Sequence, residues 1–516
     1  MRTPAAVGVL GQDLRAVHAT AHLSSSVGLV HERVLARAAR TPHAVAMRTP
    51  ARDVTFAALV SAAREIATAL DDARVPRDGR VVIAANDHAL VAAALVGVLG
   101  RGGVVVPLEP ACGAHRLARM LAVTEPAAYV LDPRMHERFP VDETPRLVRS
   151  DLGAGTGPLD ANDPDAPCSI YFTSGSTGAP RAILGRASGI DHHIAWEIDA
   201  LALDEHTRGA IVHAIGYDAY LPDLLVPICA GGTAFSPPRE ALGDPARFVA
   251  WLARQEITLV HCTPSRWREL LAEEGARDLS SLRDVVLAGE VVRPADVVAT
   301  QARCGERVRL WNLYGPTEAT LVKLHHRIVP ADAHRERIPI GRPMPRVTVQ
   351  IVDDQGVPCA PGEIGEIAIE SRYASHGYLG EPELTATRFS RVDATGEIRY
   401  LTGDLGRACP GGEIEFHGRR DRQLKLYGAR IDLDEIEAIL AGIHGVLEAA
   451  AVVDATQTAV FAFVVSGVDV AAIRQAAGER LSPAMRVARI EHRDVLPRTA
   501  SGKIDRAALA RSLEES

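Results

Sequence analysis

Short apolar runs with strand character alternate with Ala- and Leu-rich segments along the first 340 residues of this sequence. The pattern begins at Val81–Ala85, continues through an apolar segment to Leu99, breaks at Gly100–Gly103 and resumes at Val104–Val106. Further strands are predicted at residues 128–131, 257–262, 284–288 and 307–313. Such alternation is typical of parallel sheets whose strands are connected by helices, with ligands bound beyond the carboxyl ends of the strands.

The later part of the sequence has a different pattern. Short strands, separated by Gly and Pro, are predicted at 347–352, 365–369 and 413–416. A helix-spaced segment is then predicted at 433–443 and a strand at 459–465. With 516 residues the chain is too long for one compact core. We therefore predict an α/β fold with a large N-terminal domain, residues 1–420, that contains parallel sheets and a β-rich subdomain, and a small α+β C-terminal domain, residues 421–516.

The composition excludes several classes of partner. A net charge of −8 gives no reason to expect nucleic acid or an anionic membrane, and no apolar run is long enough to span a bilayer. Residues 1–23 hold no continuous apolar segment and are interpreted as an extension rather than a signal peptide. The seven cysteines are scattered singly, which favours a reducing cytoplasm over a disulfide framework or a zinc site.

One loop has the composition of a phosphate-binding turn. After the strand-like run Cys168–Phe172 the sequence reads Thr173-Ser174-Gly175-Ser176-Thr177-Gly178, and Pro180 and Arg181 follow. Glycines let the backbone bring N–H groups close to an anion, and hydroxyl groups add uncharged donors. A flexible linker has the same composition, so the loop alone leaves both interpretations open.

Four more motifs follow the loop in order. They are Asn-Leu-Tyr-Gly-Pro-Thr-Glu at 312–318, Tyr-Leu-Thr-Gly-Asp at 400–404, Gly-Arg-Arg-Asp at 418–421 and Ser-Gly-Lys at 501–503. Each is weak alone. Together with the loop they resemble the adenylate-forming superfamily, which contains acyl-CoA synthetases, luciferases and the amino-acid adenylation domains of nonribosomal peptide synthetases. The resemblance runs from about residue 28 to residue 510 and looks closest to the adenylation domains, here in a standalone form.

The resemblance implies a reaction in two steps that uses ATP and Mg²⁺. A carboxylate attacks the α-phosphate of ATP to give an acyl-adenylate and pyrophosphate, and a thiol then displaces AMP. The loop Thr173–Gly178 would hold the β- and γ-phosphates, Thr317 would contact the α-phosphate and Glu318 would hold Mg²⁺. Lys503 would neutralise both the α-phosphate and the substrate carboxylate, two anions that otherwise repel each other.

The same resemblance implies a site for the nucleoside. Its expected residues are Gly289, Glu290, Asn312, Tyr314, Asp404 and Arg419. Tyr314 would stack on adenine, and Asn312 would lie along the base. Asp404 would accept hydrogen bonds from the ribose hydroxyls, with Arg419 supporting that end.

These residues also have ordinary structural explanations. An isolated Asp404 is typical of a turn, Glu318 of a charge at a helix start, and Lys503 of a solvated side chain. The common order of the motifs favours the functional interpretation. The sequence departs from the family at Arg181, where lysine is usual, and at Leu401, where arginine is often found.

Lysines are scarce, which makes their positions informative. Of 57 basic residues only Lys323, Lys425 and Lys503 are lysines, and the last two fall where the family pattern has lysine. The family alternates between its two half-reactions by rotating the small domain about a hinge, which matches Asp421 here. Lys503 would serve adenylation, and after rotation the face around Lys425 and Gly428 would serve thiol transfer.

Asp218 resembles the aspartate that binds the α-ammonium group of an amino-acid substrate, and an aspartate that begins a helix before Pro222 is the alternative. The matching pocket positions are Ala219, Pro222, His261, Val286, Ala288, Leu313, Leu321 and Val322. Because most are apolar and two are leucines, we expect a small or medium neutral amino acid, not an indole or a strongly charged side chain. His261 is either a satisfied core residue or a hydrogen-bonding partner of a polar side-chain tip.

The sequence ends at Ser516, without a following Gly-Gly-x-Ser segment for phosphopantetheine. It also lacks the condensation motif His-His-x-x-x-Asp, because His192-His193 is followed by Glu197 at the Asp position. We therefore expect loading of a separate phosphopantetheinylated carrier protein in the biosynthesis of a natural product such as an antibiotic, with free coenzyme A as the minor acceptor. The sequence does not say whether a small helper protein is needed.

Two alternatives remain at this stage. An acyl- or aryl-CoA ligase would use the same ATP site, but such enzymes generally lack the aspartate at position 218. A non-catalytic scaffold that binds nucleotide is disfavoured by the presence of Glu318, Asp404 and Lys503. The identity of the amino acid, its stereochemistry, the carrier protein, the product and the role of Arg181 do not follow from the sequence.

Overall fold

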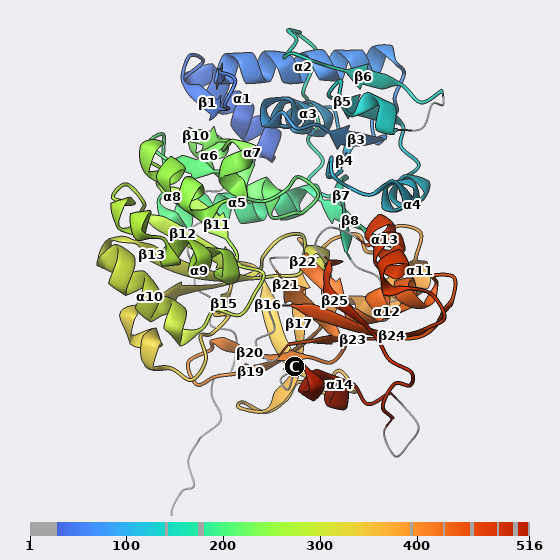
Figure 1. The fold of residues 1–516 in the computed structure, drawn as a ribbon. Coiled ribbons are helices and arrows are strands. Elements are labelled where there is room, and N and C mark those ends of the chain that lie inside the picture. The colour runs from blue at the N-terminus through green and yellow to red at the C-terminus, as the bar shows by residue number, and fades with distance from the viewer. Residues whose placement is uncertain are drawn as a thin grey trace, which may run out of the picture.

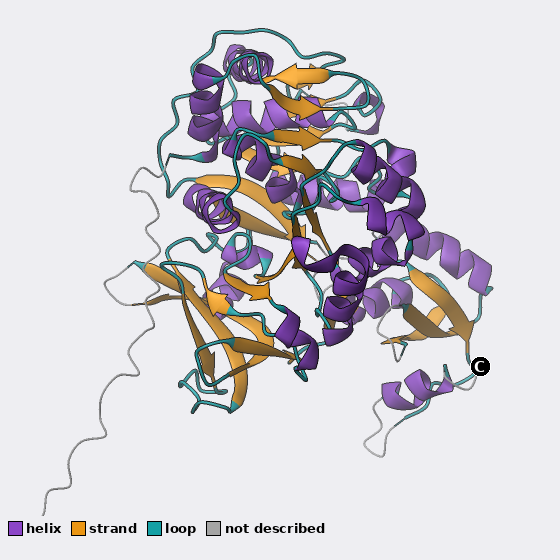
Figure 2. Cartoon of the chain, turned by 90° about the vertical axis from the view of Figure 1, so that its left-hand side faces the viewer, coloured by secondary structure: helices purple, strands orange, loops and turns teal. Residues whose placement is uncertain are grey.

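The computed structural model describes residues 28–139, 143–173, 180–392, 396–426, 429–454, 459–481, 485–498 and 504–513. Two sheets with parallel centres fill the upper and middle parts of the molecule in Figure 1. A smaller antiparallel sheet lies below them, and the C-terminal elements lie to one side. Figure 2 shows helices around the large sheets and the C-terminal elements as a distinct group.

The larger sheet has the strand order β15-β14-β13-β12-β11-β9-β10-β1-β2. Its strands are β1 (Val45–Arg48), β2 (Asp53–Thr55), β9 (Arg208–Ala210), β10 (Thr233–Phe235), β11 (Leu259–Cys262), β12 (Asp284–Ala288), β13 (Arg309–Tyr314), β14 (Leu324–Ile328) and β15 (Arg342–Pro343). The pairs from β1 through β13 are parallel, whereas β2, β14 and β15 pair antiparallel at the edges.

The second sheet has the order β6-β5-β3-β4-β7-β8. It is formed by β3 (Arg80–Ala84), β4 (Val104–Pro107), β5 (Ala128–Leu131), β6 (Arg146–Val148), β7 (Pro167–Thr173) and β8 (Arg181–Arg186). Only the β7–β8 pair is antiparallel among these described strands. Because β7 ends at Thr173 and β8 begins at Arg181, the predicted phosphate loop joins these two strands, and Ser174–Gly178 lie outside the described residues.

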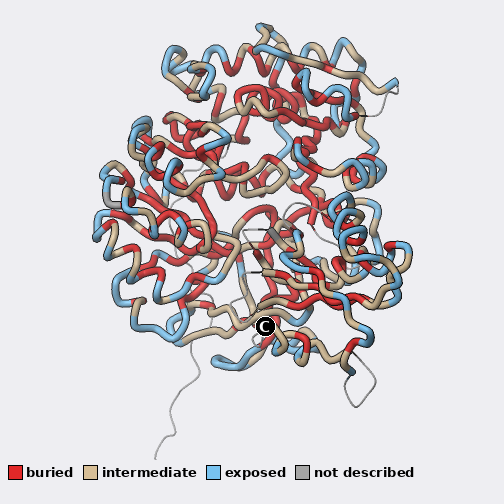
Figure 3. Tube along the Cα trace, viewed as in Figure 1, coloured by how far each residue is buried: buried red, intermediate tan, exposed pale blue. Residues whose placement is uncertain are grey.

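Helices from the first half of the chain form the shared core of the two sheets. They are α1 (Val30–Arg40), α2 (Phe56–Asp72), α3 (His88–Gly100), α5 (Ala187–Leu201) and α6 (Tyr220–Ala230). Asp87 caps the N-terminus of helix α3, because its carboxylate accepts a hydrogen bond from the Ala89 N–H at 2.9 Å. Nearly all its other residues are apolar and buried, because the helix is covered on every side. Figure 3 shows this buried centre in red.

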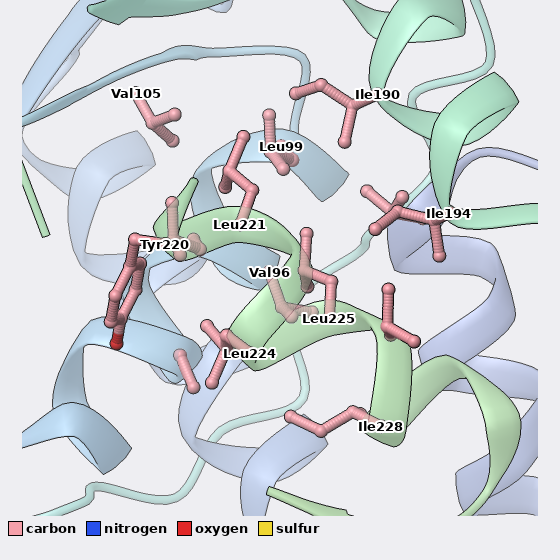
Figure 4. Close-up of a cluster of buried hydrophobic side chains, with 14 of the residues drawn as sticks. Val96, Leu99, Val105, Ile190, Ile194, Tyr220, Leu221, Leu224, Leu225 and Ile228 are labelled. Atoms are coloured by element: carbon pink, nitrogen blue, oxygen red, sulfur yellow. The ribbon is translucent and has the colours of Figure 1, made fainter. Parts of the chain in front are cut away.

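Leucine side chains of α6 form the middle of this core. Figure 4 shows Leu224 among Tyr220, Leu225 and Val96, and its side chain is completely buried. The Leu224→Ala substitution should lower the free energy of unfolding by about 2–5 kcal/mol, because the surrounding residues cannot fill the cavity. Urea unfolding followed by fluorescence measures the shift. The exposed Val298 on α10 (Pro294–Cys304) provides the control. Val298→Ala should change the free energy of unfolding by no more than about 0.5 kcal/mol. An equal loss of stability in both variants would contradict the prediction.

The remaining helices of the large sheets lie at their outer faces and ends. They are α4 (Ala114–Thr124), α7 (Arg239–Leu242), α8 (Pro245–Arg254) and α9 (Pro264–Ala272). Helices α8, α9 and α10 enclose a second core with β11 and β12, in which Trp267, Phe248 and Leu287 are completely buried. Among the described residues, no helix combines the length and apolar character that crossing a membrane requires.

The β-rich part consists of one antiparallel sheet. Its members are β16 (Thr348–Val352), β17 (Ile364–Ser371), β18 (Phe389–Val392), β19 (Glu397–Ala408) and β20 (Ile414–Arg419), with α11 (Pro382–Arg388) before β18. This arrangement agrees with the expected β-rich subdomain. Strand β19 is central, since β17, β18 and β20 all pair with it.

The C-terminal elements follow a two-stranded hairpin, β21 (Gln423–Leu426) and β22 (Ala429–Asp432). They are α12 (Leu433–Ala441), β23 (Val446–Val453), β24 (Val460–Ser466), α13 (Val470–Arg480), β25 (Val487–His492) and α14 (Arg506–Ser512). Their own apolar core includes Ile436, Leu440 and Val464. The α/β fold with a β-rich part and a C-terminal α+β part is confirmed. The boundary at 420/421 and the mobility of the small domain stay predictions.

Candidate active site

A cavity of 660 Å³ lies where the carboxyl ends of β11, β12 and β13 face the C-terminal hairpin. Among the predicted site residues, those that line it are Thr173, Asp218, Ala219, Pro222, His261, Val286, Ala288, Gly289, Leu313, Thr317, Leu321, Val322, Asp404, Arg419 and Lys425. These positions span more than 250 residues of sequence, and the fold brings them to one space. Lys503 and Ser174–Gly178 lie outside the described residues.

Parallel strand register places the expected side-chain pocket. Val286 on β12 is paired with His261 on β11, and Ala288 is paired with Leu313 on β13. Ala219 and Pro222 come from the start of α6, which faces the same strand ends. The pocket therefore lies beyond the carboxyl ends of a parallel sheet, where α/β folds bind ligands.

Asp218 lies on the cavity wall just before α6. Helix α6 has Ala219 at its N-terminal cap position and no side-chain capping bond, so the Asp218 carboxylate does not cap the helix. Instead it forms a hydrogen bond with the Thr317 side chain. Burial raises the pKa of Asp218, with smaller opposing effects from Thr317 and the Lys425 ammonium. A buried carboxylate at a cavity wall is suited to pair with a cation that enters the cavity.

Asp404 and Arg419 form an ion pair between neighbouring strands. They are directly opposite each other on β19 and β20, and the guanidinium donates to the Asp404 carboxylate. The Tyr314 hydroxyl also donates to Asp404, at 2.5 Å. Asp404 is therefore a strand residue with two fixed partners. The Lys425 ammonium lies 5.9 Å from the centroid of the Tyr314 ring.

Lys425 comes from β21, so the C-terminal hairpin reaches into the cavity; Figure 1 shows β21 and β22 near the centre of the molecule. Burial lowers the pKa of Lys425, while Asp404 acts in the opposite direction.

Lys323 has a different environment. It is completely buried and donates to the Thr320 carbonyl at 2.6 Å, and burial lowers its pKa to about 7.

Glu318 is held by side chains from two other parts of the chain. The Arg430 guanidinium on β22 lies 2.9 and 3.2 Å from its two carboxylate oxygens, and the Tyr378 hydroxyl donates at 3.0 Å. Burial acts to raise the pKa of Glu318, but Arg430 and the hydrogen bonds to the carboxylate together outweigh it, so the pKa is lowered. An ionised carboxylate fits Mg²⁺, which prefers oxygen ligands. In this structure, however, both oxygens face a guanidinium.

Two predicted nucleotide residues face other parts of the protein. The Asn312 amide donates to the Pro339 carbonyl at 2.7 Å, and the side chain is buried. The Glu290 carboxylate accepts hydrogen bonds from the Ser265 backbone N–H and hydroxyl, both at 2.9 Å. Neither residue lines the cavity, although Gly289 does, with a φ of +86°. Their roles toward the nucleotide stay predictions.

The structure adds polar residues that the sequence interpretation did not assign to the site. His193 and Glu197 on α5 and His213 line the cavity beside His261, and Arg430 lines its opposite side. The only local signal for the first two is their spacing of four, which places them on one helix face. The pairing of Glu197 with His261 joins residues 64 positions apart and has no local signal.

Sequence comparisons agree with this arrangement. The family described as AMP-binding enzyme matches residues 34–379, and the family described as AMP-binding enzyme C-terminal domain matches residues 435–503. The AMB antimetabolite synthetase AmbB of Pseudomonas aeruginosa is 32% identical over 518 residues, which cover 96% of this chain and 40% of AmbB. The phenyloxazoline synthase MbtB of Mycobacterium tuberculosis is 30% identical over 521 residues, with 98% of this chain and 36% of MbtB covered.

The crystal structure of IdnL1 has the same fold. It superposes with a TM-score of 0.79 at 27% identity, covering 92% of this chain and 99% of IdnL1. This chain spans less than half of the length of the two curated relatives. The first family match alone extends over more than half of the chain. The chain therefore belongs to the family of AMP-binding enzymes, and its resemblance to the adenylation domains of nonribosomal peptide synthetases is confirmed.

Proposed function

We propose that the protein activates an amino acid with ATP, releases pyrophosphate and transfers the aminoacyl group to a thiol. The observation that carries this proposal is the Asp218 carboxylate, which lies half-buried on the wall of the cavity among apolar side chains. Such a carboxylate offers a partner for an α-ammonium group. A carboxylic acid without an amine would leave Asp218 unpaired, which disfavours a CoA ligase.

The nucleotide is assigned to the other end of the cavity. Asp404, fixed by Arg419 and Tyr314, would accept hydrogen bonds from the ribose hydroxyls of ATP. Thr317, beside Asp218, would contact the α-phosphate. Glu318 would hold Mg²⁺, which supplies neutralisation of phosphate charge when bound. Arg430 must leave the Glu318 carboxylate before both of its oxygens are free for that role.

The side-chain pocket supports a small or medium neutral amino acid. Its apolar walls are Ala219, Pro222, Val286, Ala288, Leu313, Leu321 and Val322. An indole is too large for walls that include two bulky leucines, and a carboxylate along these walls would lose hydration without a partner.

We further propose that the acceptor is the phosphopantetheine thiol of a separate carrier protein. The proposal follows from the resemblance to adenylation domains and from the synthetase and synthase names of AmbB and MbtB. The small domain would rotate about a hinge near Asp421, so that Lys503 serves adenylation and Lys425 serves transfer.

All seven cysteines are free thiols, which favours a reducing cytoplasm.

ATP–pyrophosphate exchange across a panel of amino acids tests the proposal. We expect Mg²⁺-dependent exchange with one or a few small or medium neutral amino acids, and aminoacyl-AMP as the product by mass spectrometry. Highest turnover with Trp, Glu or Arg would contradict the proposed side-chain class. Absence of exchange with every amino acid, while a carboxylic acid without an amine is activated, would contradict amino-acid activation itself.

A further inference from the structure

Buried acidic and imidazole groups form the floor of the side-chain pocket. His261 Nε2 lies 2.5 Å from Glu197 Oε1, and His261 Nδ1 lies 3.2 Å from Asp223 Oδ1. His193 Nε2 lies 3.0 Å from Glu197 Oε2, and His213 Nδ1 lies 3.0 Å from Asp223 Oδ2. The five residues come from α5, α6, β11 and the segment before α6, and we call them the acid–histidine floor.

Both ring nitrogens of His261 are occupied by this arrangement. Burial alone would lower the pKa of His261, but Glu197 and Asp223 together raise it to about 10. The ring is therefore an imidazolium that donates to Glu197 and lies in ion-pair contact with Asp223. It has no ring nitrogen left for a ligand, so the expected hydrogen bond between His261 and a substrate tip is not available in this geometry.

Glu197 is the acidic residue of the floor that lines the cavity, and its side chain is completely buried. Burial acts to raise its pKa, but His261 and His193 lower it to about 2, so the carboxylate is ionised. Its Oε1 accepts the His261 bond. Within the described ranges, its Oε2 has no hydrogen bond of good geometry. Burying an ionised oxygen without a well-aligned donor costs free energy, and a hydrogen-bond donor on a ligand would satisfy this oxygen.

The charge of the acid–histidine floor also favours a hydrogen-bond donor on the ligand. Glu197 and Asp223 are two carboxylates with the single His261 imidazolium between them, whereas burial lowers the pKa of His193 and leaves it neutral. Asp223 is already satisfied in part by the backbone N–H groups of Val212 and His213, each at 2.7 Å. An acceptor group from a ligand would meet negative charge here, whereas a donor would meet an acceptor.

We propose that Glu197 determines specificity by accepting a hydrogen bond from the tip of the substrate side chain, so that the preferred amino acid carries a donor there. This inference rests on the proposed amino-acid activation and deepens it. A hydroxyl group is the donor that agrees with a neutral side chain. An ammonium group has the same donor chemistry, and the experiment separates the two.

Isosteric pairs of amino acids test the proposal on the unmodified enzyme. ATP–pyrophosphate exchange is measured with threonine against valine, serine against 2-aminobutyrate and homoserine against norvaline, and with 2,3-diaminopropionate and 2,4-diaminobutyrate. We expect the hydroxylated member of the best pair to have a kcat/KM at least about 10-fold higher than its apolar partner. Best activity with a diamino acid would support the donor role of the tip and overturn the neutral side-chain class. An apolar member equal to or better than its partner would overturn the inference, and loss of exchange with every amino acid would overturn the proposed function.

The Glu197→Gln variant tests the residue itself. Its amide keeps the volume but loses the charge, so the ratio of kcat/KM within the best pair should fall to about 3-fold or less while the KM for ATP is unchanged. Asp332→Asn is the matched control, because Asp332 is a completely buried carboxylate that binds His326 at 2.9 Å outside the cavity. This control should lose stability without a change in the ratio. Equal ratios in Glu197→Gln and the unmodified enzyme would overturn the assignment to Glu197, and if the variant does not fold, the isosteric pairs decide alone.

Discussion

The Asp218→Ala substitution is expected to lower amino-acid-dependent pyrophosphate exchange by at least about 100-fold. The proposed ion pair between Asp218 and the α-ammonium group lies in a buried wall, and removal of one member leaves the other charge without a partner. The loss should appear in kcat/KM, because the same contact also positions the carboxylate of the substrate for attack on ATP. Exchange assays at saturating ATP measure it.

The specificity of this effect can be checked with a different substrate and a different variant. A carboxylic acid of the same shape without an amine should be activated at least as well by the Asp218→Ala variant as by the unmodified enzyme, because the variant has no unpaired carboxylate. Asp284→Asn is the control, since Asp284 is a buried carboxylate of β12 that does not line the cavity and pairs with Arg309, 2.6 Å from its guanidinium. A proportional loss for substrates with and without an amine would contradict the role of Asp218.

The Arg430→Met substitution is expected to separate the two half-reactions. In this structure the Arg430 guanidinium neutralises Glu318 and ties the C-terminal hairpin to the large domain. Without it, Glu318 is a buried charge that lacks its strongest partner, so this arrangement of the domains becomes less stable by an amount of the order of 3 kcal/mol. Lys425, which we propose to serve transfer, lies in the cavity in this arrangement. Transfer of the aminoacyl group to pantetheine should therefore slow at least about 10-fold, while exchange stays within about 3-fold.

Mass spectrometry of aminoacyl-pantetheine, beside exchange assays on the same preparation, provides both readouts. The control is Arg493→Met, because Arg493 pairs with Glu491 inside the C-terminal part at 3.0 Å and does not line the cavity. Both rates should be close to those of the unmodified enzyme in this control. Equal losses of exchange and transfer in Arg430→Met would show that Arg430 stabilises the site in general rather than one arrangement of the domains.

The fold was largely predictable because its strands are short apolar runs between clear breaks. The predicted strand at 284–288 coincides with β12, and the one at 128–131 coincides with β5. Other boundaries differ slightly, as β13 begins at Arg309 rather than at residue 307 because a short 3-10 helix, Gly305–Arg307, precedes it. Local pattern defines such elements, whereas their ends depend on neighbouring turns.

That Asp218, Thr317 and Asp404 line one cavity was predictable, because their motifs are contiguous in the sequence. The acid–histidine floor was not, because it joins Glu197, Asp223 and His261 from separate elements, and no local pattern records that pairing. The contact between Arg430 and Glu318 spans 112 positions for the same reason. His261 shows the limit most clearly, since its role depends on the two carboxylates that surround it rather than on its own strand.

The scarcity of lysine has a practical consequence for chemical footprinting. Lys323 is sealed in the core, and Lys425 packs over the Tyr314 ring while the hairpin occupies the cavity. Reagents that acylate amines therefore meet few competing targets on the described surface of this chain. The rate at which Lys425 is acylated would report the proposed withdrawal of the hairpin, and a single peptide without any engineered label is enough to measure it.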